Sequence, residues 1–177
     1  MSLSKDRVVS ADKMMNKAKG PVWHKKQKEQ GIIPKGLRGI DKQATWCKSN
    51  ADGWLYGHGT FCLTSHRHPV LGCFLWMRNS ANEAKRMWLE TFHVKDQLEY
   101  IAMDPKADDA DLFREFNRQR RMSLITCCRP NMDKTAPRKK MVQFMKKPKY
   151  KKIYRERSYK VEPMQGLVKE IFELDRC

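Results

Sequence analysis

The chain has 177 residues, which is enough for one domain with a hydrophobic core and short for two. Lysine and arginine number 37 against 20 aspartates and glutamates, so the formal net charge is +17. This excess favours a polyanionic partner, although a basic ribosomal or chromatin-type protein without catalytic activity has a similar charge. The longest apolar run, Val70 to Met77, has eight residues, whereas a membrane-spanning helix needs about 20. We therefore expect a single domain over residues 1–177 and no membrane span.

The N-terminus and the cysteines suggest a compartment. Residues 1–7 lack the apolar core of a signal peptide. The six cysteines include no CxxC pair and no small-domain disulfide spacing, so we expect reduced thiols in a cytoplasmic protein. His66, His68 and Cys73 form a cluster that suggests zinc, but a second ligand pair at the usual spacing is missing. Ordinary turn and core positions are the favoured interpretation for these three residues.

The N-terminal segment begins with a short apolar run. Val8 and Val9 predict a buried strand over Arg7 to Ala11, and Asp12 follows it. The next stretch, Lys13 to Arg38, is basic and is repeatedly interrupted by glycine and proline. We expect a long, partly irregular insertion there.

One aromatic and several basic residues are consecutive within this insertion: Trp23, His24, Lys25 and Lys26. Basic residues beside an aromatic ring can bind a phosphate backbone while the ring stacks on a base or sugar. The alternative is a solvated loop in which Trp23 is part of the core. Residue types alone favour neither interpretation, so all four remain candidate nucleic-acid contacts.

Regular elements follow from Gly53 onward. Trp54 to Thr64 and Val70 to Met77 predict a two-stranded hairpin, and Ala81 to Phe92 predicts an amphipathic helix. Further elements are expected as a strand at Glu99–Met103, a helix at Asp108–Arg120, a strand at Met122–Cys127, a basic linker at Arg138–Lys160 and a terminal helix from Val161. The alternation predicts an α/β fold with a mixed sheet flanked by helices.

Three acidic residues are candidate metal ligands: Asp12, Asp104 and Glu162. The first two follow predicted strands, and Glu162 precedes Lys169 by seven positions on the terminal helix, which places both near one stripe. Mg²⁺ and Mn²⁺ prefer carboxylate oxygens, and two such ions ~4 Å apart can activate the attacking and leaving oxygens of a phosphodiester. The acids therefore suggest a site for phosphoryl transfer.

Asp104 is preferred over three acids that follow it closely. Those three occur where a helix is expected to begin and where acidic side chains complement the helix dipole. They are Asp108, Asp109 and Asp111. For Glu162 the following Pro163 disfavours helical dihedrals, so we expect Glu162 to cap the terminal helix.

Several stretches carry a resemblance to bacterial insertion-sequence transposases with a DDE catalytic domain. They are Gly20-Pro-Val-Trp-His-Lys-Lys26, Pro34-Lys-Gly-Leu-Arg-Gly-Ile-Asp41, Trp46, Gly53-Trp-Leu-Tyr-Gly57, and Tyr154, Arg157, Glu162 and Lys169, which resemble the family's Tyr-Arg-Glu-Lys signature. Arg157 is five positions before Glu162, whereas the family has four. The resemblance covers most of the chain and implies a ribonuclease H-like fold. It also implies a missing N-terminal DNA-binding region, because the chain begins close to Asp12.

The resemblance implies a function as well. Asp12, Asp104 and Glu162 would bind two Mg²⁺ or Mn²⁺ ions, and Tyr154, Arg157 and Lys169 would contact DNA. The expected activity is cleavage of DNA at transposon ends and joining to target DNA, by a homodimer on DNA in the bacterial nucleoid. Two alternatives stay open: an inactive, basic DNA-binding remnant, and a nuclease that never joins strands.

Overall fold

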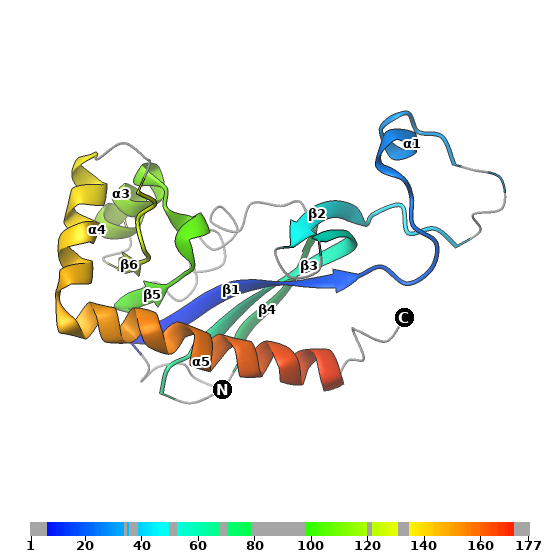
Figure 1. Ribbon diagram of the computed structural model, residues 1–177. Helices are drawn as coiled ribbons and strands as arrows, with labels where there is room; N and C mark the ends of the chain where they lie inside the picture. Colours follow the sequence, from blue (N-terminus) through cyan, green and yellow to red (C-terminus); the bar gives the residue numbers. More distant parts are fainter. Residues whose placement is uncertain are drawn as a thin grey trace.

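The computed structural model describes residues 7–33, 35, 39–49, 53–67, 71–78, 98–119, 122–130 and 135–171, with the backbone alone for 71–78 and 119 (Figure 1). The strands are β1 (Val8–Lys17), β2 (Thr45–Ser49), β3 (Gly53–Ser65), β4 (Leu71–Arg78), β5 (Tyr100–Ala102) and β6 (Ser123–Ile125). The helices are α1 (Lys25–Glu29), α3 (Ala110–Gln119), α4 (Ala136–Lys146) and α5 (Pro148–Ile171), with a 3₁₀ helix at Pro105–Ala107. The fold is therefore α/β, as predicted. The helix expected at 81–92 lies outside the described residues.

One mixed sheet joins all six described strands in the order β2-β3-β1-β5-β6, with β4 also paired to β3. β1 is antiparallel to β3 and parallel to β5, which is parallel to β6. β2 pairs with the first part of β3, Gly53–Gly57, and β4 pairs with its second part, from His58 to Thr64. Since β1 pairs with the other edge of β3, the sheet is five strand positions wide.

The two faces of the sheet carry different helices (Figure 1). Alternate residues of β1 and β5, including Val9 and Ile101, pack in one buried cluster with α3 and α4. The other set of alternate residues, including Ala102, packs with Ile153 and Tyr154 of α5. Successive side chains of a strand point to opposite faces, so this division places Ser10 and Asp12 on the face covered by α5.

β1 is longer than predicted, and Asp12 lies within it rather than after it. Asp12 is opposite Cys62 of β3, and the pairing continues to Lys17. The reason is that the basic residues conceal an alternating pattern in which Met14 and Asn16 are buried. The amide of Asn16 donates a hydrogen bond of 2.6 Å to Thr60 Oγ1.

The basic stretch at Arg138–Lys160 is helical and not a linker. α4 and α5 cover almost all of it, and α5 continues through Pro163, so Glu162 does not cap a helix. A proline removes one helical hydrogen bond, but packing of Ile153, Val161 and Val168 holds both sides of Pro163 in place.

Acids near the start of α3 have separate roles. Asp109 accepts hydrogen bonds from the backbone N–H groups of Asp111 and Leu112, as a helix cap does. Asp108 is fully buried and forms an ion pair with Arg138, which attaches α4 to the core. Asp108 therefore stabilises the fold through a buried ion pair and not, as the sequence predicted, by complementing a helix dipole.

The described part of residues 18–56, the distal lobe, projects from the end of β1 (Figure 1). Its small core contains Trp23, Ala44 and Tyr56. The indole N–H of Trp23 donates to the carbonyl of Ile32, and that of Trp46 donates to the carbonyl of Trp23. Among the described helices, none is long and apolar enough to cross a membrane.

Candidate metal and nucleic-acid site

Asp12 and Asp104 are brought together by parallel pairing of β1 and β5. Ser10 is aligned with Ala102 at the end of β5, and each acid comes two residues later in the chain, Asp12 within β1 and Asp104 past the end of β5. The negative charge of Asp104 is one of the causes that raise the pKa of Asp12, which is consistent with this proximity. The sequence prediction that these two side chains lie together is supported by this geometry.

The carboxyl group of Asp12 is held in a mostly buried position beneath α5. Burial is the largest cause that raises its pKa, and Asp104 acts in the same direction. Arg157 and Lys106 lower it by their positive charge, as does the backbone N–H of Lys13. The net effect is a raised pKa, because desolvation disfavours the charged carboxylate.

Asp104 has a structural role that the sequence did not suggest. Its side chain accepts a 3.0 Å hydrogen bond from the backbone N–H of Lys106 and so caps the 3₁₀ helix that begins at Pro105. The hydroxyl of Thr126 donates to the carbonyl of Asp104 at 2.7 Å. These contacts fix Asp104 at the end of β5 beside Asp12.

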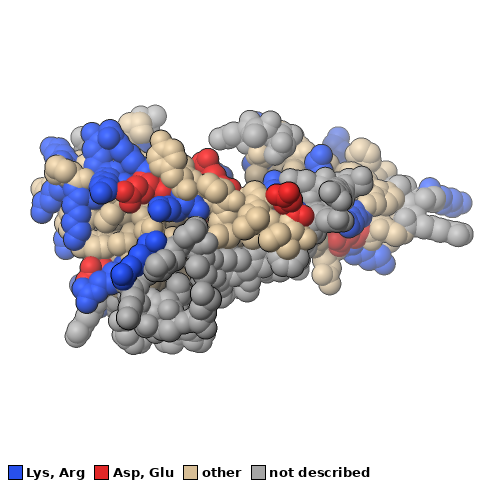
Figure 2. All heavy atoms as spheres, turned by 90° about the horizontal axis from the view of Figure 1, so that it is seen from below, with Lys and Arg blue, Asp and Glu red and all other residues tan. Residues whose placement is uncertain are grey.

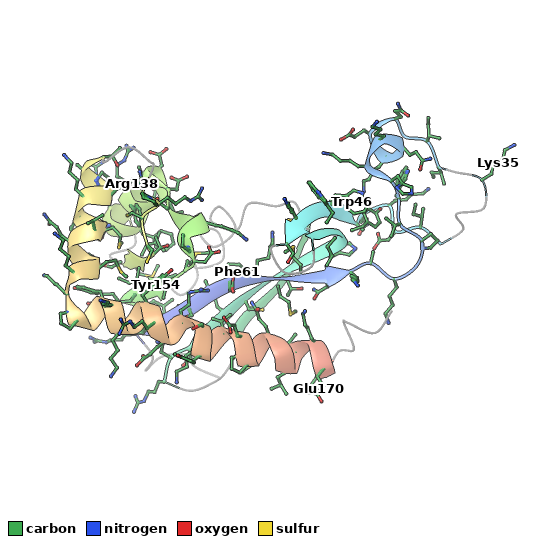
Figure 3. The ribbon with its side chains drawn as sticks, viewed as in Figure 1. Lys35, Trp46, Phe61, Arg138, Tyr154 and Glu170 are labelled. Carbon is green, nitrogen blue, oxygen red and sulfur yellow. The ribbon has the colours of Figure 1, made fainter. Side chains whose placement is uncertain are left out.

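α5 places two predicted site residues over the acids. Arg157 Nη1 lies 3.5 Å from Asp12 Oδ2, and its Nε is buried with no hydrogen-bond partner among the described residues. Tyr154 points from α5 toward the strands (Figure 3). Burial, a hydrogen bond with Cys127 and the charge of Asp104 raise the pKa of Tyr154 to about 12, so its hydroxyl stays protonated at neutral pH.

Glu162 does not join the pair. It is exposed, and it follows Arg157 by five positions, which in an α-helix is about 140° around the axis. Across the described residues, no three histidine, cysteine or acidic side chains are grouped so as to hold a metal ion. Asp12 and Asp104 fit one hard cation, because Mg²⁺ often takes one or two carboxylates and completes its shell with water and phosphate oxygens. The two-ion site predicted from three acids is not assembled.

His66 connects three elements near the site. One ring nitrogen is 2.5 Å from the hydroxyl of Ser10, and the other is 3.5 Å from the carboxylate of Glu156. His66 thereby links the end of β3 to β1 and α5, which agrees with a structural interpretation. His68 and the side chain of Cys73 lie outside the described residues. Among the described side chains, Cys47, Cys62, Cys127 and Cys128 form no disulfide.

The four aromatic and basic candidates of the insertion, Trp23 to Lys26, lie in different environments. Trp23 is 7% exposed and belongs to the core of the distal lobe, so the prediction that it stacks on a base is wrong for this conformation. His24, Lys25 and Lys26 are exposed at α1. Lys169, near the end of α5, is half-buried.

Basic side chains gather at the end of the molecule formed by α4 and the beginning of α5 (Figure 2). They include Lys139, Lys140, Lys146, Lys147, Lys149, Lys151 and Lys152. This surface continues along α5 toward Arg157 and Asp12. A long positive surface beside an acidic pair suits a polyanion.

Sequence reasoning missed several residues around the acids. Lys106 and Cys127 influence Asp12 and Tyr154, respectively, and Ser10 contacts His66. One signal was available for Cys127, which ends a predicted strand. Since Ala102 is aligned with Ile125, the parallel pairing puts Cys127 beside Asp104.

No protein-family model, curated protein or solved structure matches the chain.

Proposed function

We propose that the chain is the catalytic domain of a DDE transposase, which cuts DNA at transposon ends and joins the freed 3′ hydroxyl to a target strand. The single observation that carries this proposal is the pair of carboxylates formed by Asp12, on β1, and Asp104, just past the end of the parallel strand β5, beside a basic helix. Such a pair is suited to hold a cation near a phosphodiester.

The strand order supports the finer assignment of a ribonuclease H-like fold. In that fold three antiparallel strands are followed by two parallel ones, in the order 3-2-1-4-5. Omitting the edge strand β2, the sheet has β4-β3-β1-β5-β6, with β3 antiparallel to both neighbours and β5 and β6 parallel to β1. Asp12 lies on the first strand of that scheme, and Asp104 follows the fourth.

Each side chain has a role in this proposal. Asp12 and Asp104 would hold Mg²⁺ or Mn²⁺, which would polarise the scissile phosphate and lower the pKa of an attacking water. Arg157 would bind a phosphate oxygen and offset the charge that develops in the transition state. Tyr154, protonated at neutral pH, would orient Arg157 and Asp104 from its position on α5. Lys169 and the lysines of α4 and α5 would bind the DNA backbone.

One observation favours the second candidate, an inactive DNA-binding remnant. The guanidinium of Arg157 is beside Asp12, where a cation would bind, while Glu162 is away from the pair. In a remnant, this arrangement would persist when DNA binds. In an active transposase, binding of DNA would move Arg157 from Asp12 to a phosphate, and Glu162 would move toward the two aspartates.

The test is a cleavage and strand-joining assay on labelled DNA ends with Mg²⁺ or Mn²⁺. Wild type is expected to cleave, and Asp12→Asn and Asp104→Asn are expected to lose cleavage while they retain duplex binding. Asp111→Asn is the matched control, since it makes the same charge change on an exposed side chain.

Three other results are informative. Duplex binding without cleavage in either metal supports the remnant. Cleavage without joining supports a nuclease. Cleavage that survives both aspartate substitutions rejects the proposed site altogether.

A further inference from the structure

The distal lobe has an exposed tryptophan that differs from its other aromatic residues. Trp54 is 61% exposed, although it lies in β3 and large aromatics on strands usually pack against neighbours. By contrast, the polar atoms of Trp23, Trp46 and Tyr56 donate to backbone carbonyls inside the lobe. An exposed indole of this size favours an interaction with a partner.

Lysines flank this ring. Lys25 Nζ, from α1, is 5.7 Å from the centre of the Trp54 ring. Lys48 is paired directly with Trp54 across β2 and β3, so its side chain leaves the same face of the sheet. Both lysines are exposed. The ammonium of Lys25 lies over one face of the ring, so a base would stack on the other face, with the lysines near its phosphates.

The surroundings extend the positive surface. The described residues from 17 to 57 contain two acids, Glu29 and Asp41. Their lysines are Lys17, Lys19, Lys25, Lys26, Lys28, Lys35, Lys42 and Lys48. Asp41 is already engaged by His58 at 2.6 Å. The lobe is therefore complementary to a polyanion.

An open pocket shares Lys25 with the ring. It has a volume of about 340 Å³ and is lined by Lys25, Lys28, Glu29, Thr45 and Trp46. Trp46 faces α1 in the side-chain view (Figure 3). Lys28 holds the far wall in place, because its ammonium donates to the Lys42 carbonyl and lies over the rings of Trp23 and Tyr56.

We infer that Trp54 is a stacking site for an unpaired DNA base, with Lys25 and Lys48 binding the phosphates on either side of it. A base in a duplex is already stacked on its neighbours and has no free face for the indole. Only a base in an unpaired or frayed strand can stack on Trp54. The pocket beside Lys25 is where the next nucleotide of that strand lies. This inference rests on the proposed function, since it takes DNA as the partner.

The test compares two single strands of equal length, one of thymidine nucleotides and one with abasic sugars, by fluorescence anisotropy with the full chain. Wild type is expected to bind the thymidine strand more tightly. Trp54→Ala should lower affinity for the thymidine strand by about tenfold and leave the abasic strand within about twofold, because stacking needs the base. Trp54→Phe keeps an aromatic face and should retain most of the difference.

Two further variants separate stacking on Trp54 from phosphate binding. Tyr159→Ala removes an aromatic side chain that is 77% exposed on α5, and it should leave both affinities unchanged. Lys25→Ala should weaken binding of both strands and reduce the salt dependence by about one phosphate contact.

The inference is overturned if Trp54→Ala binds the thymidine strand as wild type does, or loses equal affinity for both strands. Those outcomes leave the proposed function intact, provided that wild type binds and cleaves duplex ends. If wild type binds neither single strands nor duplex DNA, the proposed function fails together with the stacking site.

Discussion

The guanidinium of Arg138 and the carboxylate of Asp108 form a buried pair, in which Nε donates to Oδ1 at 2.7 Å and Nη2 donates to Oδ2. Their side chains are 5% and 0% exposed. The backbone N–H of Arg129 donates a third hydrogen bond to Asp108. This pair joins α4 to the turn after β5, close to Asp104.

Replacing Asp108 by Asn should destabilise the protein by about 3–5 kcal/mol, because it removes the buried negative charge that lies against the Arg138 guanidinium. Asp109→Asn is the matched control, since Asn also caps helices well and should cost less than about 1 kcal/mol. Urea unfolding followed by circular dichroism measures both. Equal stability of the two variants would contradict the role of the pair.

The same pair predicts a pH dependence. Burial alone would raise the pKa of Asp108, but the hydrogen bonds from Arg138 and Arg129 outweigh burial and lower it. A carboxyl with a lowered folded-state pKa contributes stability above its unfolded-state pKa, and this contribution disappears as the pH falls through the folded-state value. Between neutral and acidic pH, wild type should therefore lose more stability than Asp108→Asn.

Asp12→Asn should have the opposite effect on stability. Burial raises the pKa of Asp12, so stability falls as the pH rises through the unfolded-state pKa of this group, and the loss is complete above its folded-state pKa. The variant removes that loss and should melt about 2–4 °C higher at neutral pH with EDTA present, the shift that ~1 kcal/mol gives in a chain of this size. At acidic pH, where Asp12 is protonated in both states, the difference should vanish. A lower melting temperature at neutral pH would show that the pair with Arg157 outweighs burial.

Gly57→Ala should disrupt the junction between the sheet and the distal lobe. Gly57 pairs with both Lys17 and Thr45, and a Cβ there would be 1.9 Å from the carbonyl oxygen of Asn16. Backbone cannot yield as a flexible side chain does, so we expect a loss of about 3 kcal/mol. Thermal unfolding reports this loss.

Gly166→Ala is the control for that prediction. A Cβ at Gly166 meets no atom within 4 Å, and the residue lies inside α5, in its C-terminal part. Alanine should therefore stabilise the helix by about 0.5–1 kcal/mol. Destabilisation by both alanine variants would mean that the close contact at Gly57 is not the cause.

Glu162→Gln tests whether an active complex draws Glu162 to the acids. If Glu162 moves to the two aspartates in that complex, the variant should cleave about 100-fold more slowly with unchanged duplex affinity, as for other groups that stabilise the transition state. Glu170→Gln is the control on the same helix, and its side chain lies at the far end of α5 (Figure 3). Matching cleavage rates for the two variants would place Glu162 outside the site.

Much of the fold follows from local patterns. The apolar runs of β3 and β4 and the helical spacing of Leu112, Phe113 and Phe116 in α3 are visible in the sequence, because buried strands and the buried face of a helix are apolar. The extension of β1 past Asp12 is concealed, since Lys13 and Lys17 obscure the buried Met14 and Asn16. The prediction of a basic linker at Arg138–Lys160 was wrong for a similar reason, because lysines on the solvent side dominate the composition of α4 and α5.

By itself, the sequence determined the α/β class, the large positive charge and the position of Asp104 just after a strand. Those properties depend on residue type and on periodicity along the chain. Only the tertiary structure decided that Trp23 is buried while Trp54 is exposed, that Asp108 pairs with Arg138, and that Arg157 rather than Glu162 is beside Asp12. Such contacts depend on strand register and helix rotation, and a shift of one residue in either would bring a different side chain to each position.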